Sequence, residues 1–343
     1  MTIARGTALS VLAMAAALAA TPAMSKTLTI SWWGFNGDKL QEIILDPFQE
    51  ICECEIVIET GNNADRLNRV QMRQGGGVDI IYLTDSFSQT GIELGLFQPV
   101  DRSKVPNIEG LYDLAQAPQG EFGPAYTIGR VGIVYDTAQV EEPITSWNHL
   151  WREDLASSVS LPGITTTAGP MVVLKAGEYA GTDAFEDSAP AFAALDELRA
   201  NVVKNYNTGS EMINLFSTGE ITTSIAQDFA LAQIKAAVPT VVWAELEEGS
   251  IATLNTINIP AGATEVELAH QYINFVLSPE IQQRLAEEGI DAPVHTAVEL
   301  TDEQAALWTY GDDMISSLQR VDYTKMNAAK GDWIDSWNET FGM

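Results

Sequence analysis

The sequence contains few of the residues on which most catalytic and metal sites depend. Among 343 residues there are two cysteines and three histidines. The histidines, His149, His270 and His295, stand in unrelated contexts, and His270 falls in an amphipathic helical pattern where we expect a surface position. The H-E-x-x-H, C-x-x-C, G-x-S-x-G and G-x-x-x-x-G-K-[ST] motifs are absent. We therefore expect no metal, no cofactor and no enzymatic activity, with a secreted carboxylate-based enzyme as the alternative that needs no such motif.

Basic residues are scarce as well. The chain has 18 lysines and arginines against 47 aspartates and glutamates, a net charge of −29. Such a surface repels nucleic acid and anionic lipid, so we exclude both as partners. The acidic residues are scattered along the chain, which indicates a solvated surface. A negative surface would attract a cationic ligand, but the net charge of the whole chain is weak evidence for a local binding site.

Long apolar runs are missing after the first 25 residues. Within those 25, Arg5 precedes an apolar run over 8–20, and small residues occupy 21–25. This is the layout of a secretory signal peptide, and the run is shorter than the roughly 20 residues that span a bilayer. We predict export with cleavage near Ser25. The remaining 318 residues (343 minus 25) are enough for two domains.

The two cysteines, Cys52 and Cys54, are separated by a single residue. In an oxidising compartment a disulfide is the first expectation, and the two side chains would share one face of a strand. So short a ring is strained compared with ordinary bridges. Two packed thiols or half of a metal site are therefore alternatives that the sequence leaves open.

Strand-like and helical runs alternate from residue 27 onward. Residues 27–33, 55–59 and 78–83 are predicted strands, and helical patterns cover 40–51 and 63–74 between them. The third strand is apolar enough to be buried on both faces, as in a parallel sheet. This series of strands and helices predicts an α/β lobe.

A second α/β set follows in the middle of the chain. Its predicted strands and helices cover 129–135, 158–161, 189–201, 211–217, 221–226 and 240–244, before a last strand over 251–259 and a helix over 265–276. No low-complexity linker separates two halves, so we expect strands to connect the lobes and act as a hinge. We assign 26–126 plus 255–300 to lobe 1 and 127–254 plus 301–343 to lobe 2.

Polar and aromatic residues gather where the strands of lobe 1 end. In α/β sheets, ligands bind at the carboxyl ends of the strands, and aromatic faces there hold an alkyl chain or a cation. Neighbours on a strand point to opposite faces, so we take Trp33 as the ligand-facing tryptophan of the adjacent pair. Thr84 or Asp85 would alternatively cap the next helix. The candidate ligand-binding residues of this lobe are Trp33, Phe35, Asn36, Asp38, Thr84, Asp85 and Ser86.

The second lobe contributes hydroxyl groups and one carboxylate. Thr165, Thr166 and Thr167 follow a predicted strand and open a helix. Hydroxyls and free N–H groups at a helix start form a pocket for phosphonate or carboxylate, although capping alone is an alternative. Asp228, after the strand over 221–226, and Asn255, on the returning strand, complete the candidate set.

Several segments resemble the periplasmic solute-binding proteins of the polyamine (spermidine/putrescine) group. They include LTISWWGFNGDKLQEIILDPFQE, VDIIYLTDSF and AHQYINFVLSPEIQQRLAE. The group belongs to a wider cluster that also serves thiamine, ferric iron and 2-aminoethylphosphonate transporters. The resemblance implies a two-lobed, type II-like α/β fold in the periplasm, closing at a hinge around a small ligand. It also implies delivery of the ligand to the permease subunits of an ABC importer in the inner membrane.

The resemblance carries over to the candidate site unevenly. The family's first-strand tryptophan aligns with Trp33, and its polar residues at the third strand align near Thr84 and Ser86. Its acidic pair in the second lobe falls on the threonine run over 165–167, and its acid on the returning strand falls on Asn255. A diammonium ligand buried without carboxylates would be costly.

We therefore expect a small organic amine, polyamine-like or related, with Asp38, Asp85 and Asp228 as candidate partners of an ammonium group. The alternative is a zwitterion, such as 2-aminoethylphosphonate or an amino-acid-like compound, with its anionic end at the threonine run. A ferric-complex receptor would need clustered tyrosines, and Tyr82, Tyr126 and Tyr206 form no cluster in the sequence.

Overall fold

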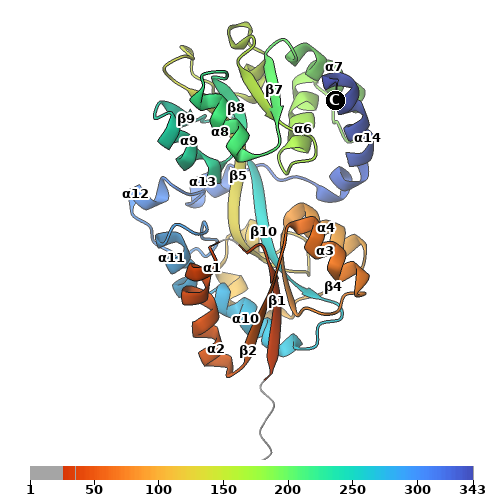
Figure 1. Ribbon diagram of the computed structural model, residues 1–343, viewed down its shortest axis with the longest axis vertical. Coiled ribbons are helices and arrows are strands. Elements are labelled where there is room, and N and C mark those ends of the chain that lie inside the picture. The colour runs from red at the N-terminus through yellow and green to blue at the C-terminus, as the bar shows by residue number, and fades with distance from the viewer. Residues whose placement is uncertain (1–25, 35, 343) are drawn as a thin grey trace, which may run out of the picture.

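The computed structural model describes residues 26–34 and 36–342. They form two lobes, one above the other in Figure 1, joined by the long strands β5 (Ala125–Asp136) and β10 (Ile251–Pro260). The predicted signal peptide, residues 1–25, lies outside the described residues. No described helix is long and apolar enough to cross a membrane. The predicted two-lobed α/β fold, with strands connecting the lobes, is confirmed.

A single sheet runs through both lobes in the order β2-β1-β3-β10-β5-β8-β6-β7, with β4 on β10 and β9 on β5. In the lower lobe, β1 (Thr27–Trp32) lies between β2 (Glu55–Thr60) and β3 (Ile80–Thr84), and all three are parallel. The returning strand β10 is antiparallel to β3 and to β5. The carboxyl ends of β1 and β3 therefore meet the two crossing strands where the lobes join.

The helices of the lower lobe follow the predicted alternation with one difference. The expected helix over 40–51 is divided into α1 (Gly37–Leu40), a π-helical turn and α2 (Asp46–Cys52). Pro47 has no N–H to donate to the preceding turn, which accounts for the irregularity. The remaining elements are α3 (Asn63–Met72), α4 (Asp85–Glu93), β4 (Phe97–Gln98), α5 (Asp113–Gln116), α10 (Val266–Val276) and α11 (Pro279–Glu287).

Cys52 and Cys54 form a disulfide at the corner between α2 and β2. Glu53, between them, has a left-handed backbone with φ of 49°. Of the three alternatives for the cysteines, the disulfide is therefore the one observed. Their expected placement on a strand is wrong, because Cys52 ends a helix and the chain reverses at Glu53.

In the upper lobe, β5 pairs with β8 and with β9, the sheet continues from β8 to β6 and β7, and helices cover it. Its long carboxyl-terminal helix, α14 (Tyr323–Phe341), buries Met326, Trp333 and Trp337 in the core of this lobe. The other elements are β6 (Val159–Pro162), β7 (Val202–Tyr206), β8 (Thr223–Gln227), β9 (Val241–Trp243), α6 (Gly169–Ala180), α7 (Ala189–Leu198), α8 (Gly209–Ser217) and α9 (Leu231–Ala237).

Two hydrophobic clusters make up most of the core, one in each lobe. Two short helices, α12 (Asp302–Ala305) and α13 (Asp312–Ser316), lead from the lower lobe to α14. Ile315 of α13 packs with the lower cluster, whereas α14 packs with the upper one. Residues 301–343 thus contact both lobes, and our division of the chain at 126, 254 and 300 stays a prediction.

The histidines singled out in the sequence have structural partners. His270 is buried, with Nε2 accepting from the Asp101 N–H at 2.9 Å and Nδ1 2.7 Å from the Val266 carbonyl. The expected surface position is wrong, because the turn after Asp101 covers this part of α10. His149 accepts a hydrogen bond from the Thr145 N–H at 3.3 Å.

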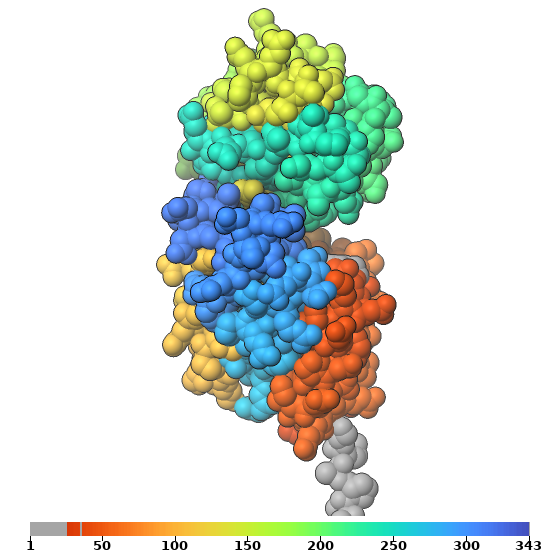
Figure 2. All heavy atoms as spheres, turned by 90° about the vertical axis from the view of Figure 1, so that its left-hand side faces the viewer, coloured from red at the N-terminus to blue at the C-terminus, as the bar shows by residue number. Residues whose placement is uncertain are grey.

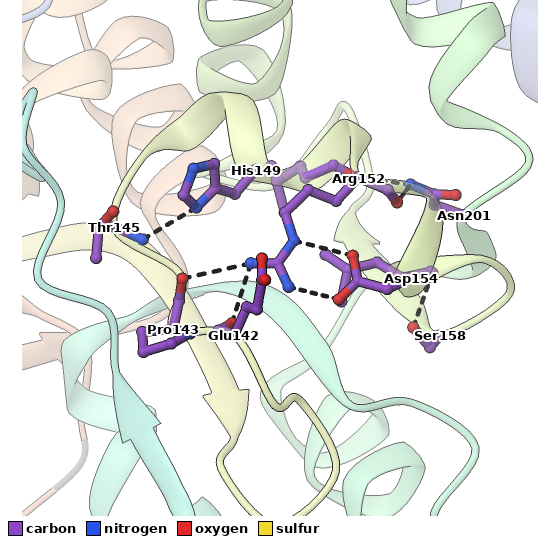
Figure 3. A network of polar contacts seen from close by, with 10 residues as sticks. Glu142, Pro143, Thr145, His149, Arg152, Asp154, Ser158 and Asn201 are labelled. Atoms are coloured by element: carbon purple, nitrogen blue, oxygen red, sulfur yellow. Dashed lines mark hydrogen bonds and ion pairs between the residues drawn. The ribbon is translucent and has the colours of Figure 1, made fainter.

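The loop around His149 is held together by Arg152 (Figure 3). The Arg152 guanidinium donates to the Glu142 carbonyl at 3.0 Å and to Asp154 Oδ1 at 2.9 Å. Asn201 donates in turn to the Arg152 carbonyl at 2.9 Å. Side chains thereby satisfy backbone groups that the irregular loop leaves unpaired, and they fix it to the upper lobe.

Candidate ligand-binding site

A cavity of about 460 Å³ lies between the lobes, where β5 and β10 cross. Its volume falls in the range of small-molecule pockets. Figure 2 shows the two lobes as separate masses, with the blue carboxyl-terminal segment lying at the level where they meet. The residues that line the cavity are Trp33, Thr84, Thr127, Ile128, Gly129, Thr167, Gln227, Asp228, Phe229, Thr253, Asn255, Ile290, Asp291, Ala292 and Trp308.

Five of the twelve residues proposed from the sequence line this cavity. They come from different parts of the chain, and the strand-end rule brings two of them together, because β1 and β3 run parallel and end at the same edge. Trp33 lies at the cavity, whereas its neighbour Trp32 is 9% exposed and belongs to the lower core. The five are Trp33, Thr84, Thr167, Asp228 and Asn255.

Four other candidates do not line the cavity. Asn36 and Asp38 are exposed at the start of α1. Thr165 and Thr166 line a neighbouring cavity of about 440 Å³, which shares Thr167 with the first. The Thr166 hydroxyl donates to the Gly163 carbonyl at 2.8 Å and accepts from the Gly169 N–H at 3.1 Å, so it caps the start of α6. Phe35 lies outside the described residues.

Asp85 and Ser86 also lie outside the lining, at the start of α4. The Asp85 carboxylate is 2% exposed and accepts from the Leu254 N–H at 2.9 Å and the Ser86 N–H at 2.8 Å. Burial raises the pKa of Asp85 to about 7, although these hydrogen bonds and the Tyr323 hydroxyl favour the charged form. Asp85 thus ties α4 to the crossing strand β10, and it is not placed to meet a ligand in the cavity.

Asp228 reaches the cavity from the turn after β8 in the upper lobe. Its carboxylate accepts from the Thr309 hydroxyl and from the Arg130 N–H. It lies close against β5, since a Cβ on Gly129 would stand 2.9 Å from Asp228 Oδ1. Burial raises the pKa of Asp228, while the Thr309 hydroxyl and Arg130 oppose that shift.

Asp291 is a second carboxylate of the cavity, and the sequence analysis did not find it. It follows α11 in an irregular loop of the lower lobe and also borders a small internal cavity of about 20 Å³ beside Tyr82, Tyr126 and Tyr272. Within residues 26–34 and 36–342, no hydrogen bond or ion pair to the Asp291 carboxylate is observed. Burial raises the pKa of Asp291 to about 7. No sequence signal marks it, because it ends no strand and caps no helix.

Trp33 is held in place from behind by Asn63 and Arg66. Its indole N–H donates to Asn63 Oδ1 at 3.1 Å, and the Arg66 guanidinium carbon stands 4.7 Å from its ring centroid. Arg66 is fully buried and donates to the Gly61 carbonyl at 2.8 Å and the Ser31 carbonyl at 3.1 Å. Burial lowers the pKa of Arg66 to about 10. Trp33 is therefore a fixed aromatic wall, and Trp308 and Phe229 add two further rings to the lining.

Two of the three tyrosines that show no cluster in the sequence, Tyr82 and Tyr126, gather in the lower lobe together with Tyr272. The Tyr82 and Tyr272 hydroxyls are 2.8 Å apart, and the Tyr82 and Tyr126 rings are 4.9 Å apart in an edge-to-face arrangement. Tyr206 lies in the upper lobe and donates to the Ile225 carbonyl. Burial raises the pKa of Tyr82 and Tyr126 well above the usual range, so they stay neutral phenols.

This tyrosine cluster does not resemble a site for a ferric ion. The Tyr82 and Tyr272 hydroxyls hydrogen-bond to each other in the core of the lower lobe, at 2.8 Å, and neither tyrosine lines the cavity between the lobes. In the described part of the chain there is also no group of three histidine, cysteine or acidic residues that would hold a metal ion. The cluster is best understood as packing that positions Asp291 and Trp33 at the cavity.

Comparison with known proteins identifies the family. The model of the family described as bacterial extracellular solute-binding protein matches residues 77–317. The putrescine-binding periplasmic protein SpuD of Pseudomonas aeruginosa is 24% identical over 289 residues, 78% of each chain. PotF of Escherichia coli, also a putrescine-binding periplasmic protein, is 24% identical over 298 residues, 80% of this chain and 79% of PotF.

Solved structures agree on the fold. An ABC transporter structure from Clostridium perfringens is 37% identical, covers 91% of this chain and 99% of its own, and has a TM-score of 0.87. The spermidine/putrescine substrate-binding protein PotD of Streptococcus pneumoniae is 21% identical, covers 92% and 99%, and has a TM-score of 0.74. The chain belongs to the bacterial extracellular solute-binding proteins, the components of ABC transporters that bind a small molecule, deliver it to the permease and are not enzymes.

Proposed function

We propose that this protein is the periplasmic receptor of an ABC importer for a small organic amine, polyamine-like or related. One observation carries the proposal: two carboxylates, Asp228 and Asp291, line the cavity, and no lysine, arginine or histidine does so among the described residues. An ammonium group is the natural partner of such a site, because a buried charge needs an opposite charge or hydrogen bonds. The names of SpuD and PotF point to the same ligand class.

The arrangement also gives a mechanism for closure. Asp291 belongs to the lower lobe and Asp228 to the upper, so a ligand between them contacts both lobes. A ligand that binds the closed form better shifts the population toward it, as in hinge closure of binding proteins. Aromatic rings of Trp33, Trp308 and Phe229 would enclose the carbon skeleton. Delivery to the periplasmic face of a permease follows from the predicted signal peptide and from the periplasmic relatives.

A zwitterion, such as 2-aminoethylphosphonate or an amino-acid-like compound, is the second candidate. The observation in its favour is that the cavity shares Thr167, Gln227 and Phe229 with the neighbouring one, which lies at the start of α6. A helix start attracts an anionic group. We rank it second because neither cavity, within the described residues, is lined by a basic side chain.

A thermal-shift panel on residues 26–343 tests the proposal. The panel contains putrescine, spermidine, 2-aminoethylphosphonate, taurine, glycine betaine, thiamine and ferric citrate. A ligand present at about 100 times its dissociation constant adds roughly 2.7 kcal/mol of stability. We expect an amine to give the largest shift and Asp291→Asn to abolish it. A shift with taurine or ferric citrate alone would contradict an amine receptor.

A further inference from the structure

Resting on the proposed function, we propose that the ligand is a monocation: Asp291 holds its single positive charge, and Asp228 already has hydrogen-bond donors within the protein. The two carboxylates of the cavity differ in their surroundings, although both come from irregular segments. One has protein donors and a nearby cation, and the other has neither. The difference decides how many positive charges the closed cavity accepts.

Asp228 is compensated by Thr309 and Arg130. The Thr309 hydroxyl and the Arg130 N–H donate to its carboxylate, and Thr309 is fully buried. The Arg130 guanidinium is the cation in its electrostatic environment, and Asp228 is the leading acidic neighbour of Arg130. A polar, uncharged group of a ligand would suffice to complete the hydrogen bonding of Asp228.

Arg130 is fixed at this position, outside the cavity that holds the ligand. Its guanidinium carbon stands 4.7 Å from the Trp243 ring centroid, and it lines a separate cavity with Glu245 and Asp313. Both of these acids are exposed, so water screens their charges. Arg130 therefore favours the charged form of Asp228, although the two side chains form no ion pair in the described part of the chain.

Asp291 has no such compensation. No donor to its carboxylate is observed in the described parts of the chain, and its neighbours Tyr82 and Tyr126 are neutral. The buried cation of this lobe, Arg66, directs its N–H groups to carbonyl oxygens and to Asn63. Arg66 also stacks on Trp33, and a positive charge on that ring disfavours a second cation there.

Asp291 is therefore the lining carboxylate that lacks a protein donor among the described residues, whereas Asp228 already has two. One ammonium group would pair with Asp291, but the second ammonium of a diammonium ligand would have no unpaired carboxylate to meet, and Arg66 behind Trp33 would disfavour it. The chemical class that fits is a primary or substituted amine with an apolar middle and an uncharged polar end. The apolar middle would lie along Trp33, and the polar end would meet Asp228.

Four compounds with the same four-carbon chain test the charge assignment by isothermal titration calorimetry. They are 4-amino-1-butanol with one positive charge, putrescine with two, zwitterionic 4-aminobutyrate and neutral 1,4-butanediol. We expect 4-amino-1-butanol to bind tightest, about tenfold more tightly than putrescine. Asp291→Asn should weaken its binding by about tenfold or more, and Asp228→Asn by less than about threefold. The control is Asp335→Asn, which removes an exposed carboxylate from α14.

Arg130→Gln gives the sharpest outcome, because it frees the charge of Asp228 without touching the lining. It should reverse the preference, so that putrescine binds more tightly than 4-amino-1-butanol. If Arg130→Gln does not fold, the four ligands measured on the wild-type protein test the monocation assignment. Tighter binding of putrescine to the wild type, with equal losses in both aspartate variants, would overturn the monocation assignment and leave the amine receptor standing. Absence of binding by all three amines would overturn the proposed function itself.

Discussion

Asp228 and Asp291 line one cavity from opposite lobes, and among the described residues donors are observed to Asp228 alone. Asp228 follows β8 in the upper lobe, and Asp291 follows α11 in the lower. The strands that join the lobes, β5 and β10, pass directly beside them. A ligand that pairs its cation with Asp291 and its polar end with Asp228 would contact both lobes and so favour closure over the open form.

The Asp291→Asn variant should be more stable than the wild type without ligand, increasingly so at higher pH. Burial raises the pKa of Asp291 to about 7 from its usual 3.8, so the folded state retains a proton that the unfolded state loses. Wild-type stability thus falls as pH rises from about 4 to about 7, relative to the variant. The difference should be near zero at pH 4 and on the order of a few kcal/mol above pH 7.

Urea unfolding of the two proteins from pH 4 to pH 8 measures this difference. The Asp335→Asn variant provides the matched control, because its carboxylate is exposed on α14. A difference that stays constant with pH would show that Asp291 is not buried as a charged group.

The sequence predicted most strands and the two-lobed arrangement, because apolar periodicity and burial agree over these segments. β3, for example, is apolar throughout and buried along almost its whole length. β7 was missed because only its last residue is buried, so that it shows no buried face in the sequence. The helix over 40–51 was expected as one element, and Pro47 divides it.

The candidate site was predictable only where it follows a strand. Trp33, Thr84 and Asp228 were found because strand ends mark the ligand edge of an α/β sheet. Asp291 was not found, because its approach to Trp33 depends on how an irregular loop packs. Asp85 was predicted as a ligand-binding residue, but its carboxylate accepts a hydrogen bond from the Leu254 N–H of β10. Leu254 lies 169 residues away in the sequence, so this contact could not be predicted from local patterns.

Asp85→Ala should destabilise the fold and leave ligand affinity unchanged. Removing the carboxylate leaves the buried Leu254 N–H without an acceptor, which costs about 1–3 kcal/mol. Asp85→Asn keeps an acceptor for the Leu254 N–H but turns an NH2 donor toward the Ser86 N–H, so it should lose less stability than Asp85→Ala. Denaturant unfolding and calorimetry with the same amine separate the two effects. A large loss of affinity in Asp85→Asn would instead place Asp85 among the binding residues.

Arg66→Lys should destabilise the lower lobe although it keeps the charge. The guanidinium of Arg66 serves carbonyl oxygens of Ser31, Gly61 and Tyr82 at once, and an ammonium group cannot reproduce this planar geometry. We expect a loss of about 2–4 kcal/mol in denaturant unfolding. Because the guanidinium also supports the Trp33 ring, ligand affinity should fall even where the variant is fully folded. Arg69→Lys, at a partly exposed position of α3, provides the comparison. An equal loss of stability in that variant would contradict a specific role for the Arg66 guanidinium.

Gly129→Ala should weaken amine binding with little effect on the backbone. An added Cβ would stand 2.9 Å from Asp228 Oδ1 and 3.1 Å from Thr253 Oγ1, so both groups must move. Gly129 is not among the glycines with a positive φ, so the backbone accepts alanine. Gly37→Ala is the matched control, because nothing lies within 4 Å of its added Cβ. We expect calorimetry to show weaker binding for Gly129→Ala alone. Unchanged affinity in that variant would mean that the position of Asp228 does not matter to the ligand. Asp228 would then not be a ligand-binding residue.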